Sequence, residues 1–298
     1  MPSPHDLCDL QSIKAWIYGD SSNSKWPVTG DAMLSAYISA ASRAVLSALQ
    51  RSTLAVRTVN EIQSGIGGPR MMLKQYPLIG DLLSLTVEGK SVGKRPAIGS
   101  QQTARGVGWM CENPWDGFGP GQNPLIAYVG GCFARGVANV EVSYRAGYAV
   151  LNEPAVIPST TPYTVQPLLP LGRFAGDVSV SYDDETPLVP VATSGAVAAG
   201  KYLPPQQPAV IIDMSWKPAY TFDASDAGKP VLLSYSFTPA DLAFATAKWI
   251  GEWWKYKDRI GEQSRALPQG AGTASFDLSA MPKDVALIIQ PYKRLVTV

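Results

Sequence analysis

Apolar residues recur at intervals of three and four near both ends of the chain, which predicts helices there. The first should follow a cap at Ser3 or Asp6, and the second should open at Gly30-Asp31. A third should begin at Thr238-Pro239, with Thr238 as N-cap, and end at Gly261. A final short helix is expected over residues 282–289. The apolar faces of the first three are Leu7, Leu10, Ile13 and Ile17; Leu34, Ile38, Ala41, Val45 and Leu49; and Leu242, Ala245, Trp249, Trp253, Tyr256 and Ile260.

Between these helices the period changes to two, which is typical of strands. Strands are expected first at 55–62, 70–74, 82–88, 125–129 and 137–144, with a long glycine-rich loop over 90–123. Beyond residue 151 acidic residues outnumber basic ones, proline is frequent and the expected strands are short: 178–182, 189–192, 210–214, 220–222 and 231–236. Many short strands with frequent turns indicate an antiparallel sandwich or barrel.

The fold class predicted from these patterns is α+β, with two domains. A small helical bundle and a β-hairpin or sheet should form a host domain over residues 1–150 and 238–298. Residues 151–237 should form an inserted antiparallel β-sandwich-like domain. An insertion of this kind costs the host little when the ends of the inserted domain lie close together.

Composition narrows the function classes. The charged fraction of 16% is low for a free-standing soluble enzyme, and a net charge of +1 gives no global attraction to nucleic acid or an anionic membrane. The chain has no apolar run long enough to span a bilayer, and its first residues lack the pattern of a secretory signal. We therefore expect a cytosolic product with no membrane partner.

The residues that usually carry chemistry are scarce. His5 is the one histidine and lies near the N-terminus, so neither a histidine-based nucleophile nor a zinc site is expected. Cys8, Cys111 and Cys132 lack metal-binding or disulfide spacing and are expected to be small buried residues. The acidic run 183–185 is better explained as a hairpin turn than as a calcium loop. No enzymatic activity, metal or cofactor is predicted.

Aromatic residues on the third helix suggest assembly instead. Trp249 and Trp253 lie one turn apart and are expected to belong to the core, whereas Trp254 lies about 100° around the helix. Trp254, with Lys257 and Arg265, is therefore a candidate for an interface with another subunit, because aromatic residues are enriched at interface centres.

A succession of short motifs resembles one family. They are Leu10, Ile13, Lys14 and Trp16; Gly-Gly-Pro-Arg-Met-Met-Leu-Lys-Gln-Tyr-Pro-Leu-Ile over 67–79; Tyr-Arg-Ala-Gly-Tyr over 144–148; Asp-Leu-Ala-Phe-Ala-Thr-Ala-Lys-Trp over 241–249; and Met-Pro-Lys-Asp-Val over 281–285. In this order they are similar to the head-to-tail adaptor, or head-completion connector, proteins of tailed bacteriophages. Residues 90–123 and 151–237 are longer than that family needs.

The resemblance implies a non-enzymatic subunit of the virion neck, assembled in the host cytoplasm. Copies of the chain would form a ring, a dodecamer, under the portal protein and above a tail or stopper protein. Genomic DNA would pass through the ring without sequence-specific binding. The resemblance also implies that the C-terminal end engages the portal, through Tyr292, Lys293, Arg294, Leu295, Val296 and Val298. A last strand in the chain's own sheet is the alternative for this tail.

Two other functions remain open. One is another virion structural component, such as a tail terminator or baseplate protein. The other is a carbohydrate-binding or hydrolytic accessory protein that would use the tryptophan-rich segments and residues 109–118. No credible acid–base pair supports the hydrolytic version. The inserted domain, with its acidic composition, is expected to decorate the outside of the ring or to contact the capsid or tail.

Overall fold

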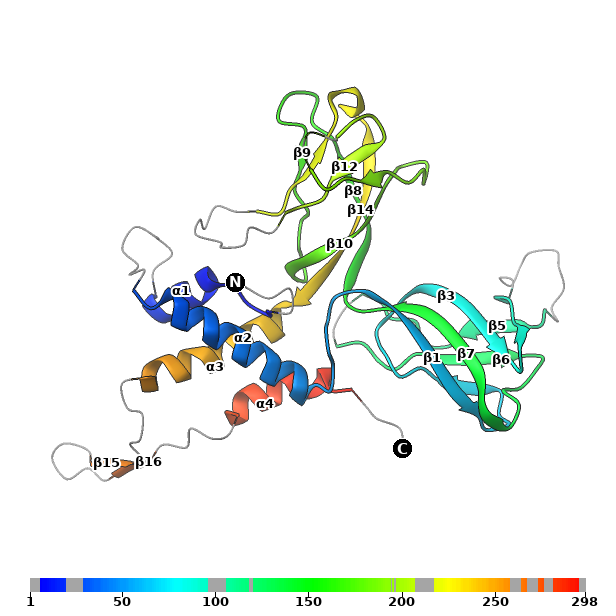
Figure 1. Ribbon diagram of the computed structural model, residues 1–298, viewed down its shortest axis with the longest axis horizontal. Helices are drawn as coiled ribbons and strands as arrows, with labels where there is room; N and C mark the ends of the chain where they lie inside the picture. The colour runs from blue at the N-terminus through cyan, green and yellow to red at the C-terminus, as the bar shows by residue number, and fades with distance from the viewer. Residues whose placement is uncertain are drawn as a thin grey trace. The chain divides into compact units, whose positions relative to one another are not determined.

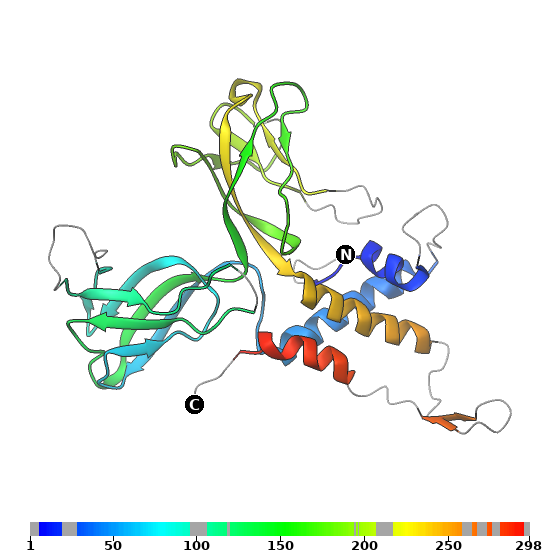
Figure 2. The ribbon, with the colours of Figure 1, turned by 180° about the vertical axis from the view of Figure 1, so that it is seen from behind.

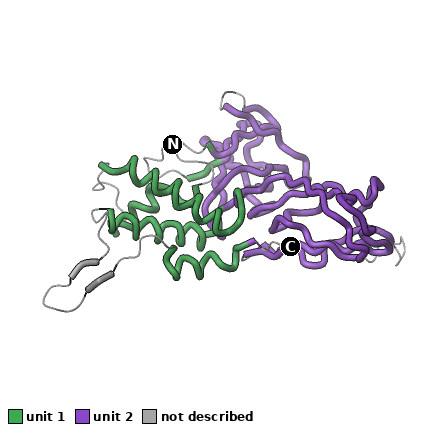
Figure 3. The backbone as a smooth tube through the Cα atoms, turned by 60° about the horizontal axis from the view of Figure 1, so that its bottom comes forward, with its two compact units in different colours: residues 1–52, 206–219, 238–293 green, residues 53–205, 220–237, 294–298 purple. Residues whose placement is uncertain are grey.

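The computed structural model describes residues 6–19, 29–95, 106–117, 120–193, 195, 197–206, 217–257, 264–266, 273–275 and 281–294, the two short segments at 264–266 and 273–275 by their backbone alone. Helices and antiparallel sheets are both present, which confirms the α+β class (Figure 1). The chain divides into two compact units, coloured separately in Figure 3. The helical unit comprises residues 1–52, 206–219 and 238–293, and the β unit comprises 53–205, 220–237 and 294–298.

The β unit contains the strands of two β segments, one before and one after residue 148. Tyr148 links these two segments. Its N–H donates to the Leu54 carbonyl at 3.0 Å, and its carbonyl accepts from the Phe237 N–H at 3.1 Å. The ring of Tyr148, which is fully buried, also packs against Trp115 and Phe237. Backbone hydrogen bonds and aromatic packing thus join the first β segment to the second.

The helical unit consists of α1 (Leu10–Tyr18), α2 (Asp31–Ala48), α3 (Ala240–Tyr256) and α4 (Lys283–Ile289), followed by the short 3₁₀ helix Gln290–Tyr292 (Figures 1 and 2). α3 contacts each of the other three helices. The N-cap of α1 is Asp9, whose carboxylate accepts from the Ser12 N–H at 2.7 Å. The buried apolar residues include Ile13, Leu34, Ile38, Val45, Leu242, Ile250, Val285 and Ile289.

The start of α3 differs by one residue from the expectation. Thr238 is not the N-cap, because the preceding strand β14 (Pro230–Pro239) stays extended through Pro239 and the helix follows it directly. Pro239 is the N-cap and makes no side-chain capping bond. The described part of α3 ends at Tyr256, and residues 258–263, with the expected stop at Gly261, lie outside the described residues. Beyond them, β15 (Ser264–Ala266) and β16 (Thr273–Ser275) pair antiparallel.

The first β segment contains two sheets around one core. One sheet has the order β1 (Arg57–Gly65), β7 (Gly136–Ala146), β3 (Leu78–Val87), β4 (Lys90–Ser91). The other has the order β2 (Arg70–Met72), β6 (Leu125–Val129), β5 (Gly108–Cys111). β4 and β5 fall within residues 90–123, where the sequence predicted an unbroken loop. Their shared core includes Leu82, Leu85, Trp109, Ile126, Phe133, Val142 and Tyr144.

The second β segment also packs two sheets on one core. β10 (Gly172–Tyr182), β14 and β8 (Ala149–Val156) form one sheet. β11 (Val189–Pro190), β12 (Lys201–Leu203), β13 (Tyr220–Phe222) and β9 (Thr164–Val165) form the other. Buried residues from both sheets, including Phe174, Val180, Tyr202, Tyr220, Phe222, Leu233 and Tyr235, form a single cluster. The arrangement is sandwich-like, and we call residues 149–237 the β module. The strand expected at 210–214 lies outside the described residues.

Candidate assembly surfaces

Tyr292 is a core residue of the helical unit. Its side chain is 5% exposed, and its hydroxyl donates to Asp241 Oδ2 at 3.0 Å. Its carbonyl accepts from Arg51 Nε at 3.2 Å. The sequence placed Tyr292 among the portal-contact candidates, but here the ring anchors the end of α4 on α3. A second link between these helices is the ion pair of Lys248 with Asp284. That ion pair holds the pKa of the Asp284 carboxyl below its usual range.

Of the three tryptophans of α3, Trp249 is buried as expected, whereas Trp253 and Trp254 are both half-buried. Trp249 is buried, and its ring centroid lies 5.1 Å from that of half-buried Trp253, which also packs edge-on against Tyr37. Trp254 is half-buried, and Lys257 Nζ lies 4.6 Å from the centroid of its ring. The edge of this ring also lies 3.0 Å from where a Cβ on Gly30 would be. Trp254 and Lys257 therefore form one cation–π pair at the end of α3, next to the N-cap of α2.

The remaining interface candidates are only partly described. Lys293 is exposed, and Arg294 is half-buried in the β unit. Arg265 belongs to β15, whose side chains are not described, and Leu295, Val296 and Val298 lie outside the described residues.

An aromatic pair that the sequence analysis did not single out lies exposed on the helical unit. Trp16 of α1 and Phe244 of α3 meet edge-to-face with their centroids 5.3 Å apart, and each is 46% exposed. The indole of Trp16 also lies against Gly251, where an added Cβ would come within 2.8 Å of its nitrogen. The pair therefore holds a fixed position while half of its surface remains open to a partner.

The buried carboxylates of the described residues each accept a hydrogen bond from a tyrosine. Tyr144 donates to Glu61 at 2.5 Å, Tyr235 to Glu153 at 2.6 Å and Tyr182 to Asp226 at 2.8 Å. Half-buried Asp177 accepts from both Tyr202 and Tyr220. Burial raises the pKa of the Tyr144, Tyr235, Tyr202 and Tyr220 hydroxyls, and the neighbouring carboxylates raise it further. These hydroxyls stay protonated and act as fixed donors, so the carboxylates serve structure.

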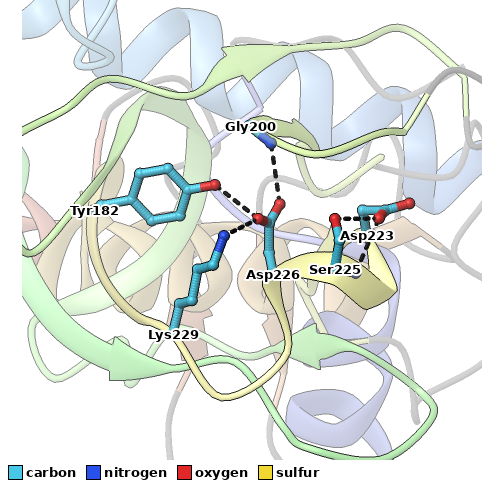
Figure 4. Close-up of polar contacts among 6 residues, drawn as sticks. All are labelled: Tyr182, Gly200, Asp223, Ser225, Asp226 and Lys229. Carbon is cyan, nitrogen blue, oxygen red and sulfur yellow. Dashed lines mark hydrogen bonds and ion pairs between the residues drawn. The ribbon is translucent and has the colours of Figure 1, made fainter.

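Asp226 is the most connected of these carboxylates, as Figure 4 shows. Its side chain is 0% exposed and accepts hydrogen bonds from Tyr182 Oη at 2.8 Å, the Gly200 N–H at 3.1 Å and Lys229 Nζ at 2.7 Å. Burial raises the pKa of Asp226, but the three donors together outweigh it and hold that pKa below its usual range. The carboxylate thereby ties β10, the turn before β12 and the turn before β14 into one end of the β module.

Between the two β segments lies a cavity of about 470 Å³. We call it the β3–β8 cavity, because its apolar lining comes mainly from the start of β3 and of β8: Leu78, Ile79, Val150, Leu151, with Trp115 and Leu171. Asp116 is the charged residue among those that line it. Leu151 is 45% exposed, so the cavity opens to solvent along one edge of β8. An apolar cavity of this size is large enough for one or two aliphatic side chains.

At the far end of β7 two aliphatic side chains project into solvent. Ile66 is 74% exposed and Val137 is 90% exposed. The Gly65–Gly136 pairing and the hydrogen bond from the Ala138 N–H to Ser64 Oγ place both residues at the same end of the β1–β7 ladder. We call this end the β1–β7 tip. Exposed Arg135 belongs to it as well, since its Cβ lies 3.9 Å from where a Cβ on Gly67 would be.

Comparison with known proteins gave structural likenesses but no sequence match. No family model matches the chain, and neither does any curated protein. A chain in a solved structure entitled "Neck of empty GTA particle computed with C6 symmetry" aligns over 100% of this chain and 95% of that chain, with 11% identity and a TM-score of 0.37.

The structure also tests the expectations about chemical groups. The described residues contain no group of three or more His, Cys, Asp or Glu side chains that could hold a metal ion. Among the described helices, none is both long and apolar enough to cross a membrane. Residues 183–185 form the expected hairpin turn, in which the Glu185 N–H donates to the Tyr182 carbonyl. Cys8 is buried as expected, but Cys132 is exposed, because it lies in the turn that follows β6. His5 lies outside the described residues.

Proposed function

We propose that this chain is a structural subunit of a phage neck, without enzymatic activity. In the proposal, copies form a dodecameric ring between the portal protein and a tail or stopper protein, and genomic DNA passes through the channel. The observation that carries it is the distribution of side chains. The buried carboxylates are engaged by tyrosines, whereas large apolar side chains remain exposed on well-packed elements. The motif order that resembles head-to-tail adaptors supports the same role.

Charge is compatible with a channel through which DNA must move. Each phosphate contact made by a lysine or arginine strengthens binding to DNA and would retain it in the channel. With a net charge of +1 the chain has no excess of cations for such contacts. A ring of these subunits would enclose DNA by shape and leave it free to slide.

The proposed portal contact involves the last residues of the chain. Lys293 and Arg294 precede the apolar residues Leu295, Val296 and Val298. Burial of one such aliphatic side chain contributes about 1.5–3 kcal/mol before ordering costs are subtracted. Trp254, Lys257 and Arg265 remain candidates for the contact between subunits. Tyr292 is left out of both surfaces because it is buried.

A pull-down with the portal protein tests the tail. Deletion should begin at residue 295, because a deletion from residue 291 would also remove Tyr292 and loosen α4. We expect the chain lacking 295–298 to keep its melting temperature and to bind the portal at least tenfold more weakly. Lys201→Glu, an exposed charge reversal in the β module, is the matched surface control. Unchanged binding by the truncated chain would refute the tail contact.

Electron microscopy of the chain mixed with portal tests the role as a whole. The proposal predicts rings stacked coaxially on the portal, with a central channel. Labelled protein found only at the tail tip of intact particles would favour the baseplate alternative. Hydrolysis or binding of a glycan by the purified chain would favour the accessory-protein alternative instead.

A further inference from the structure

The β1–β7 tip is an apolar projection and the β3–β8 cavity is an apolar recess. They lie at opposite ends of strand β7. The tip is at the Gly136 end of β7, and Leu78 of the cavity pairs with Ala146 at the other end. Ten steps along an antiparallel strand cover about 33 Å. The tip of a subunit therefore cannot reach the cavity of the same subunit.

The tip has the shape of a narrow apolar projection. Ile66 and Val137 are flanked by Gly65, Gly67 and Gly136, which have no side chains to widen it. At Gly65 an added Cβ would lie 1.9 Å from the Ala134 carbonyl oxygen, so two backbone segments approach closely there.

The ladder is irregular beside Val137. The register between β1 and β7 shifts between Gln63 and Gly65, and Ala138, next to Val137, has a φ of 52°. A positive φ is uncommon for a residue with a side chain, and β-bulges often terminate regular strand pairing. Val137 lies at this irregular end of β7 and is 90% exposed.

We propose that the β1–β7 tip of one copy of this chain inserts into the β3–β8 cavity of the next copy. Ile66 and Val137 would then contact Leu151, Trp115 and the other apolar residues of the cavity. Charge favours the same partner, because exposed Arg135 belongs to the tip and Asp116 lines the cavity. The projection and the recess are different surfaces, so this contact between copies is head-to-tail. Such contacts form a closed ring when the rotation from each subunit to the next adds up to a full turn. The contact rests on the proposed ring and specifies how its subunits join.

Disulfide trapping between two differently labelled subunits tests this contact. One subunit carries Val137→Cys and the other Leu151→Cys, both with Cys132→Ser because Cys132 is exposed. Oxidation should give covalent dimers that disappear on reduction. In the control pair, Val156→Cys replaces Leu151→Cys. Val156 lies on the same strand β8 and is 62% exposed, but it does not line the cavity. Dimers from the first pair alone support the contact.

Charge reversal gives a second, independent measurement by analytical ultracentrifugation. Arg135→Glu should weaken self-association at least tenfold, and Asp116→Lys in the adjoining copy should restore it. Equal dimer yields from the test and control cysteine pairs, or no dimers at all, would overturn the contact. Rings seen by microscopy without tip–cavity dimers would overturn only the contact, whereas the absence of rings on the portal counts against the neck role itself.

Discussion

Replacement of Asp226 by alanine should destabilise the β module strongly. The buried carboxylate accepts hydrogen bonds from Tyr182, Gly200 and Lys229, and bonds to a charged acceptor contribute about 1.5–3 kcal/mol each. Lys229 is 47% exposed and Tyr182 is half-buried, so both can regain water after the substitution. We therefore expect a loss of about 3–4 kcal/mol in the free energy of unfolding, below the summed range of about 4.5–9 kcal/mol.

Calorimetry and hydrogen exchange measure this loss. Since 1 kcal/mol shifts the melting temperature of a unit of this size by about 2–4 °C, the β unit should melt roughly 6–16 °C lower. Amide exchange monitored by mass spectrometry should accelerate around residues 182, 200 and 226–229. Asp183→Ala, an exposed acid in the neighbouring hairpin turn, is the matched control and should change stability by less than about 0.5 kcal/mol.

The pH dependence has a definite sign. The donors hold the folded-state pKa of Asp226 below its usual value, which is about 3.9 in an unfolded chain. The stability that this depression contributes is fully present above the unfolded pKa and is lost as pH falls through the folded pKa. The difference in free energy of unfolding between wild type and Asp226→Ala should therefore become smaller below about pH 4. The reasoning would be refuted if this difference became larger on acidification. It would also be refuted if Asp226→Ala lost no more stability than Asp183→Ala.

Three further substitutions test other parts of the structure. Tyr292→Phe removes the hydroxyl that binds Asp241 and should lower the stability of the helical unit by about 1 kcal/mol in chemical denaturation. Gly65→Ala would bring a Cβ within 1.9 Å of a main-chain oxygen. It should lower the free energy of unfolding by about 1–3 kcal/mol and increase hydrogen exchange of the amides at the β1–β7 tip. Tyr144→Phe leaves the buried Glu61 carboxylate without its shortest hydrogen bond and should cost about 2 kcal/mol in thermal unfolding.

The elements that the sequence predicted well have a strong local signal. β6 and β13 match the expected bounds, because β6 is a short apolar run and β13 alternates apolar and polar residues, each between turn residues. α4 also matches to within one residue. Among the strands that were missed, β4, β5, β9 and β12 have two to four residues, too few for a period to be visible. β8 was missed for another reason, since it contains Pro154, which weakens a strand assignment.

The assembly surfaces depend on long-range contacts that no local pattern encodes. The burial of Tyr292 follows from Asp241 and Arg51, which are distant in sequence and meet it only in the folded helical unit. The β3–β8 cavity likewise needs residues from both β segments. For the tip a signal did exist, because an isoleucine inside a Gly65–Gly68 turn cannot easily be buried. The turn itself is predictable from its glycines, and the exposure of Ile66 follows from it.

The tyrosine–carboxylate bonds link internal rigidity to the capacity for assembly. Each hydrogen bond joins a strand to a loop or to another strand through a buried carboxylate. Leaving such a carboxylate without a hydrogen bond would lower the stability of the fold. Two packed β segments fixed in this way present Val137 and the β3–β8 cavity without further ordering, and association then loses less conformational entropy. The residues that stiffen the subunit would therefore also favour the proposed contact between copies.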